Sequence, residues 1–245
     1  MRTVFPTLLA ILALAPTLLW ADSGVRRPSL AGIALGMSYE EARTVLIARD
    51  MKPARSSAGG FEDRVKGLRA KTHSARAKGV QGDLIPVAVT FPFTSKASGA
   101  LEVTFVTDDS GWFVGAVTTR RRYGTSYPEA FETIQNLKEA FGFRKSSCTS
   151  RGQFGFHSNV WNRKVVRMRN TKTCLKGLDF DQMSDWKTFF QEVGGAYNMD
   201  HGVTLKLSNS GAAPLGYVDR IETRLVDYTR SIKAIETKLE IGAGT

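Results

Sequence analysis

The sequence predicts an α+β chain in which helices pack on one face of an antiparallel sheet. Helix-start signals followed by apolar residues at helical spacing occur in two separate parts of the chain, residues 36–46 and 124–142. After each of them come β-branched or alternating apolar segments bounded by turn residues, which is the pattern of strands.

In the first half, Ser38 and Glu41 form the capping-box pattern that begins a helix. Pro53 is expected to end this helix, and Phe61 opens a second, short, basic helix over 61–71. Three strands are then predicted at 83–91, 100–106 and 112–123, with the turn "TDDSG" before the last of them.

The second half repeats this order. Ser126 and Glu129 form another capping box, and Gly142 is placed to end the helix that follows. Strands are predicted at 153–161 and 164–169, a helix at 181–193, strands at 202–208 and 216–226, and a polar helix at about 228–240.

Two short stretches nearly repeat, "GMSYEEA" at 36–42 and "GTSYPEA" at 124–130. A second echo places Val114, Val117 and Arg120 over Val218, Ile221 and Arg224. Together the two echoes favour a tandem duplication of a helix-helix-strand-strand-strand unit. The alternative is that Ser-x-x-Glu is simply a common way to begin a helix.

The N-terminal residues resemble a secretory signal peptide. Arg2 precedes an apolar run, and the small Ala21 stands before Asp22, where cleavage is expected. The alternative is an uncleaved membrane anchor. The expected organisation is a signal peptide (1–21), a flexible leader (22–29), a first helix-sheet unit (30–123) and a second unit with a disulfide-bearing insertion (124–245). No transmembrane segment is expected after signal removal, and the protein is expected in the periplasm or outside the cell.

The chain has two cysteines, Cys148 and Cys174. In an oxidising compartment paired cysteines usually form a disulfide, which is the favoured interpretation here. A redox pair and a metal site are the alternatives, but the sequence contains no Cys-x-x-Cys and no histidine close to either cysteine.

The segment "IALGMSYEEARTVL" (33–46) resembles the opening helix motif of the SmpA/OmlA (BamE-like) envelope proteins and of the β-lactamase-inhibitor proteins. The residues that carry the resemblance are Ile33, Gly36, Met37, Ser38, Glu41, Ala42 and Leu46. It implies a helix pair packed on a three-stranded antiparallel sheet, present twice in tandem in the inhibitor proteins. The group's lipoproteins have an anchoring cysteine, whereas Asp22 follows the expected cleavage point here.

The sequence contains no recognisable catalytic motif. Gly-x-Ser-x-Gly, a Gly-rich phosphate loop and a dinucleotide fingerprint are absent. His73, His157 and His201 are far apart and lack metal-ligand spacing. A hydrolase site assembled in space around His157 or His201 is the alternative function, and no cofactor or metal is predicted.

Basic residues are the more informative pattern, since the formal net charge is +11. Three arginines end the predicted strand 112–123, and three more share one face of 163–169 by alternation. This predicted anion-binding surface consists of Arg120, Arg121, Arg122, Arg163, Arg167 and Arg169. The alternative is a solvated basic face. In an exported protein, a basic surface indicates a non-enzymatic role in binding a protein partner, an anionic lipid or a polymer of the envelope, and not nucleic acid.

Overall fold

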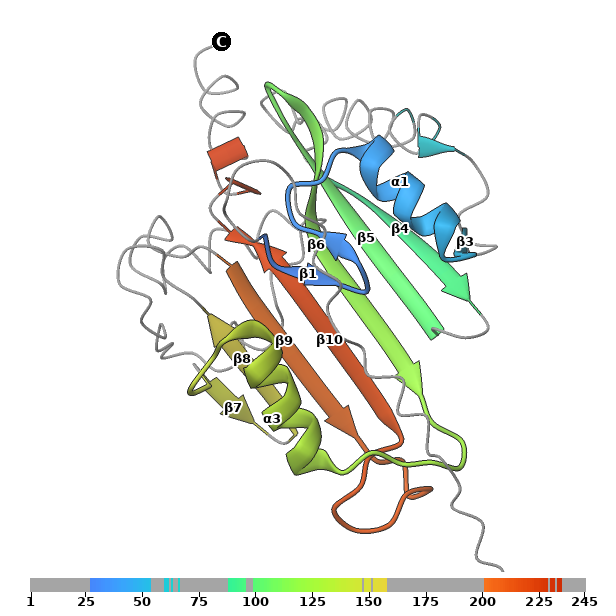
Figure 1. Ribbon diagram of the computed structural model, residues 1–245, viewed down its shortest axis with the longest axis vertical. Coiled ribbons are helices and arrows are strands. Elements are labelled where there is room, and N and C mark those ends of the chain that lie inside the picture. Colours follow the sequence, from blue (N-terminus) through green and yellow to red (C-terminus); the bar gives the residue numbers. More distant parts are fainter. Residues whose placement is uncertain are drawn as a thin grey trace, which may run out of the picture.

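The computed structural model describes residues 27–53, 60–61, 63, 66, 88–95, 99–146, 148–150, 152–157, 201–228, 230–231 and 233–234. Its central feature is an eight-stranded antiparallel sheet in the order β3-β4-β5-β6-β10-β9-β8-β7 (Figure 1). With helices α1 (Tyr39–Ala48) and α3 (Ala130–Phe141), this confirms the α+β class and the antiparallel sheet. The strands are β3 (Lys52–Pro53), β4 (Ala88–Ser95), β5 (Gly99–Asp108), β6 (Gly111–Arg122), β7 (Cys148–Ser150), β8 (Gln153–His157), β9 (His201–Ser208) and β10 (Arg220–Asp227). A separate small hairpin joins β1 (Ser29–Leu30) to β2 (Ile33–Ala34).

Helix α1 begins as the sequence predicts. The Glu41 backbone N–H donates to Ser38 Oγ at 3.3 Å, and the Ser38 N–H donates to Glu41 Oε2 at 2.7 Å. The expectation that Pro53 ends the helix is wrong. The helix ends at Ala48, and Pro53 lies in β3. The chain turns earlier because Asp50 adopts a left-handed conformation with φ of 51°.

Helix α3 begins later than predicted. Ser126 is not its N-cap. Glu129 occupies that position and makes no side-chain capping bond. Pro128 is the physical reason, because proline disfavours helical backbone at the residue before it. The first helical N–H, that of Ala130, donates instead to the carbonyl of Gly216 at 2.9 Å. The predicted stop at Gly142 is confirmed, with φ of 71°.

The strand predictions near the centre of the sheet are confirmed within a few residues. The β4 strand extends to Ser95, beyond the predicted end at residue 91, and 83–87 lie outside the described residues. The last strand starts at Arg220, not at residue 216, because Tyr217 and Val218 make turn contacts with Pro214 and Pro128. The β8 part of the 153–161 prediction is confirmed, while the remainder, 164–169 and the helix 181–193 lie outside the described residues.

The main hydrophobic core lies between the sheet and the elements drawn in front of it in Figure 1. Figure 1 shows α1 across β4 and β5, and α3 across β8 and β9. The sheet contributes alternate residues, as one buried face requires. Among its almost fully buried side chains on this face are Phe105, Leu205 and Leu225, each 1 % exposed or less. From α1 come Ala42 and Leu46.

A second buried group occupies the intervening positions of the same strands. Val106, Phe113 and Val226 are each 1 % exposed or less. The guanidinium of Arg230 lies 3.7 Å from the centre of the Phe113 ring, and its Nε donates to Asp108 Oδ2 at 2.7 Å. Partial burial alone would raise the pKa of Asp108, but hydrogen bonds from Arg230 and from the Ser110 backbone outweigh it and lower the pKa. This group therefore fixes the residues after β10 to the start of β6.

No helix in the described part of the chain is long and apolar enough to cross a bilayer.

Candidate anion-binding groove

The three arginines predicted at the end of β6 line a groove of about 500 Å³. The groove lies where β6 and β9 end and where β5 and β10 begin. Its lining combines residues from all four strands, namely Gly99, Ala100, Arg120, Arg121, Arg122, Lys206, Ser208, Arg220, Ile221 and Glu222. We call this feature the basic groove.

Antiparallel pairing brings these residues together from distant parts of the chain. Arg122 pairs with Arg220, and Arg120 pairs with Glu222, across the β6–β10 junction. On the other side of β10, Glu222 pairs with Lys206. Residues two apart on a strand share a face, so the side chains at these positions face the same side of the sheet.

A glycine allows the sheet edge of the groove to close tightly. Gly99 has φ of +78°, a conformation that side chains rarely adopt. A Cβ atom placed there would lie 2.6 Å from the backbone oxygen of Arg120. The β4–β5 turn therefore approaches the β6 backbone only because residue 99 has no side chain.

Of the three predicted arginines that the structure describes, Arg120 is the one that two carboxylates neutralise. Its Nε donates to Glu222 Oε2 at 2.7 Å, and its Nη1 donates to Glu102 Oε1. Burial alone would lower the pKa of Arg120, but these two hydrogen-bonded carboxylates outweigh burial and raise it. Arg120 therefore joins β5, β6 and β10, and its charge is compensated.

The remaining basic side chains of the groove are available to an anion. Arg122, Lys206 and Arg220 are exposed, and none makes an ion pair with a carboxylate of the described residues. Hydrogen bonds from Ser210 lower the pKa of Asp219, and Arg220 is still near enough to that carboxyl to help lower it. Arg121 lies with its guanidinium 5.0 Å from the centre of the Tyr123 ring. Arg121 alternates with Arg120 and Arg122 and so faces the other side of the sheet. On its shared face the groove thus has three positive charges besides Arg120, and one carboxylate, Glu222, that Arg120 already binds.

The other predicted site residues are not part of this groove. Arg163, Arg167, Arg169 and Cys174 lie outside the described residues, as does His73. The backbone of Cys148 is in the edge strand β7, and its disulfide with Cys174 stays a prediction.

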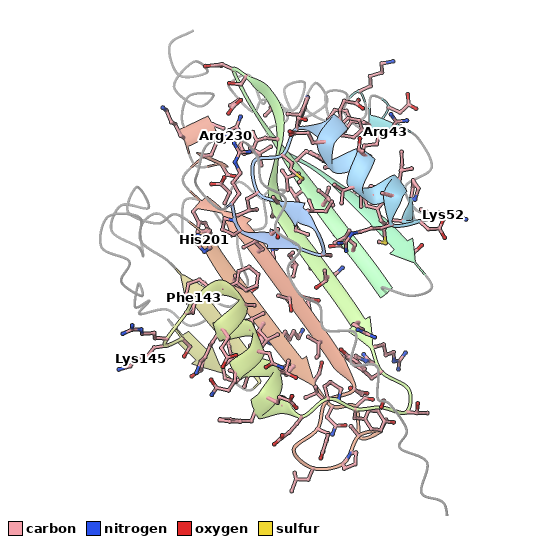
Figure 2. The ribbon with its side chains drawn as sticks, viewed as in Figure 1. Arg43, Lys52, Phe143, Lys145, His201 and Arg230 are labelled. Atoms are coloured by element: carbon pink, nitrogen blue, oxygen red, sulfur yellow. The ribbon has the colours of Figure 1, made fainter. Side chains whose placement is uncertain are left out.

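The histidines of the alternative hydrolase hypothesis belong to β8 and β9. His201 begins β9, pairs with Asp227, and has its ring centre 5.7 Å from that of Phe143 (Figure 2). His157 ends β8 opposite Gly202, and only its backbone is described. His201 is therefore at the opposite end of β9 from the groove residue Ser208. Among the described residues, no group of three His, Cys, Asp or Glu side chains is arranged to hold a metal ion.

Sequence reasoning missed Lys206 and Arg220. The local signal was present, because Lys206 lies between Leu205 and Leu207 and so occupies the opposite face from these apolar residues. What the sequence did not contain was the pairing partner. The junction of β6 with β10 joins residues about a hundred positions apart, and only this pairing places Arg220 beside Arg122.

Comparisons with protein-family models, with curated proteins and with solved structures found no match to this chain.

Proposed function

We propose that this chain is an exported, non-enzymatic protein of the cell envelope that binds an anionic component in the basic groove. The observation that carries the proposal is the cluster of Arg122, Lys206 and Arg220, three exposed cations that make no ion pair with a carboxylate of the described residues. Arg220 is near enough to Asp219 to add to the lowering of its pKa by Ser210, but it does not bind that carboxyl directly. Like charges directly opposite each other destabilise an antiparallel pair. The Arg122–Arg220 pair therefore costs stability, and binding an anion between them would offset that cost.

The proposed compartment determines which anions the groove meets. The apolar run between Arg2 and Ala21 supports export, and the formal charge of +11 favours a negatively charged partner. In the envelope, the abundant anions are lipid headgroups, lipopolysaccharide and wall polymers. All of them offer phosphate or carboxylate groups that a planar guanidinium binds in bidentate fashion.

We infer further that the chain is a tandem duplication with helices on one face of the sheet. In the sequence echo, Thr119 and Arg120 correspond to Thr223 and Arg224. Thr119 is also the residue that pairs with Thr223 across the β6–β10 junction. Two repeats related by a local twofold axis at this pair would meet in this way, so the register supports the inference. The basic groove would then be a product of the junction between repeats.

Titration with inorganic polyphosphate at low salt tests the proposed function. The variant Arg122→Gln/Lys206→Gln/Arg220→Gln removes three charges from the groove and keeps the side-chain stems. We expect wild type to bind and this variant to bind at least tenfold more weakly, since each cation beside an anionic surface contributes about 1 kcal/mol.

The matched control removes three exposed charges elsewhere. Arg43, Lys52 and Lys145 lie away from the groove (Figure 2). The variant Arg43→Gln/Lys52→Gln/Lys145→Gln has the same net charge as the groove variant. Equal losses in the two variants would mean that polyphosphate responds to net charge alone, and the proposal would be wrong. Wild type that fails to bind at low salt would also overturn it, and a protein partner would then be the better hypothesis.

A further inference from the structure

Three large apolar side chains are exposed at the end of the molecule where the basic groove lies. Leu215 is fully exposed in the loop between β9 and β10, and Tyr217 in the same loop is 42 % exposed. Phe131, in the first turn of α3, is 66 % exposed. We call Phe131, Leu215 and Tyr217 the apolar tip.

Hydrogen bonds hold the loop of the apolar tip in one shape. The Asn209 amide donates to the carbonyl of Ala213 at 2.7 Å and accepts from the Gly211 N–H at 2.8 Å. Ser210 bonds to Asp219 through both its hydroxyl and its backbone N–H, which closes the base of the loop. The exposure of Leu215 is therefore built into a bonded loop.

The tip is joined to α3 and to the groove. Gly216 accepts from the first N–H of α3, and residues 129 and 217 form an isolated β-bridge. Ser208 and Arg220 flank the loop on either side and line the basic groove. Figure 1 shows the loop extending past the ends of β9 and β10, beside the start of α3. Apolar and cationic side chains thus occupy one end of the sheet.

We propose that this end docks on an anionic lipid surface, with the apolar tip entering the headgroup layer and Arg122, Lys206 and Arg220 contacting lipid phosphates. This inference rests on the proposed function and specifies its anion. An exposed leucine at the same end of the sheet as two exposed aromatic rings and a group of cations suits an interface that is apolar below and negatively charged above. Tyr217 suits the same boundary, because its ring is apolar and its hydroxyl is polar. The charge complementarity favours lipid over an uncharged partner.

Each half of the surface has a separate expected contribution. Each basic residue near an anionic membrane strengthens binding about fivefold, so removing three weakens it on the order of 100-fold. Replacing Leu215 by serine removes an apolar side chain from the interface and keeps the charge. We expect this to weaken vesicle binding about tenfold.

Sedimentation with vesicles tests the inference. Vesicles of phosphatidylcholine alone are compared with vesicles of phosphatidylcholine and phosphatidylglycerol in equal parts. Wild type is expected to bind the anionic vesicles and to bind the neutral ones far more weakly. Leu215→Ser is expected to lose affinity for the anionic vesicles while retaining polyphosphate binding. Because the Leu215 side chain is fully exposed, the urea unfolding midpoint of the Leu215→Ser variant should equal that of wild type.

The matched control is Ile47→Ser. Ile47 is an exposed aliphatic residue of α1, 63 % exposed, and is not part of the tip. This variant is expected to bind vesicles as wild type does. Equal binding by Leu215→Ser and wild type would overturn the inference. Binding of polyphosphate without binding of anionic vesicles would also overturn it, and would leave the proposed function standing. If wild type binds neither polyphosphate nor anionic vesicles, both this inference and the proposed function are wrong.

Discussion

Replacing Arg220 by glutamate is expected to stabilise the fold and to weaken anion binding in the same molecule. Arg220 pairs directly with Arg122 across the β6–β10 junction, where two positive charges repel. On the other side of β10, Lys206 of β9 is diagonal to Arg220, because Lys206 pairs with Glu222, two residues further along β10. The new carboxylate would stand opposite the Arg122 guanidinium and diagonal to the Lys206 ammonium group, so the repulsion would become attraction. The substitution would also lose the attraction between Arg220 and the adjacent Asp219, which offsets part of this gain.

The magnitude follows from the pairing and from exposure. An opposite-charge cross-strand pair contributes roughly 0.2–1 kcal/mol, and relief of the like-charge pair adds a similar amount. Because Arg122 and Arg220 are exposed, solvent screens both effects, and the lost attraction to Asp219 subtracts from them. The net gain in the free energy of unfolding is therefore at most about 0.5 kcal/mol. The groove loses one positive charge and gains one negative charge. At about 1 kcal/mol per charge, its affinity for anionic vesicles falls by at least tenfold.

Urea denaturation and vesicle sedimentation on the same preparation measure both quantities. The gain in stability should shrink at high salt, because salt screens exposed charges. The matched control is Lys145→Glu, which makes the same charge reversal at an exposed residue away from the groove. It should leave stability near that of wild type and weaken vesicle binding less. An Arg220→Glu protein that is less stable than wild type, or that binds anionic vesicles equally well, would refute this reasoning.

Three further predictions concern the rest of the fold. Gly115→Ala should lower the free energy of unfolding by about 1–3 kcal/mol in urea, because the added methyl group would lie 2.5 Å from a buried valine; an unchanged midpoint would contradict this packing. The pKa of Asp108 is lowered in the folded state from its ordinary value of 3.8. Its contact with Arg230 therefore stabilises the fold fully at pH values above 3.8, and this stabilisation is lost as the pH falls through the lower, folded-state pKa. The stability gap between wild type and Asp108→Asn should therefore narrow from pH 7 to pH 3, and a constant gap would count against the contact. Thiol labelling of the denatured, unreduced protein should find no free thiol at Cys148 or Cys174, and two labelled cysteines would reject the disulfide.

Local chemistry made part of the fold predictable. The capping box of α1 uses residues three positions apart, so the sequence alone was enough to place it at Ser38. The same pattern failed at Ser126, because Pro128 restricts the backbone and a distant carbonyl, that of Gly216, satisfies the first N–H of α3. A capping pattern describes what a segment can do alone, and a tertiary contact can replace it.

Only the part of the candidate site that lies within one strand could be predicted from the sequence. The run Arg120–Arg122 identified the end of β6, but it did not distinguish its members. Arg120 is neutralised by Glu102 and Glu222, which come from two other strands, whereas Arg122 has no such partner among the described residues. Charge compensation between strands depends on register, and the pairing of β6 with β10 spans about a hundred residues. No local pattern contains that information.

The two ends of β6 show why the net charge of the chain is a poor guide to its binding site. At one end, Arg230 lies over the Phe113 ring and binds Asp108, so its charge serves to hold the chain. At the other end, Arg122 faces Arg220, an arrangement that costs stability and that an opposite charge at either position would relieve. Arginine is thus compensated at Arg230 and at Arg120, where it joins elements of the fold, whereas Arg122 makes no ion pair with a described carboxylate. The groove also stands beside a loop whose leucine is fully exposed, so an apolar cost and an electrostatic cost coincide at one end of the sheet. A ligand that is both negatively charged and apolar would relieve both, and an anionic lipid surface has that combination.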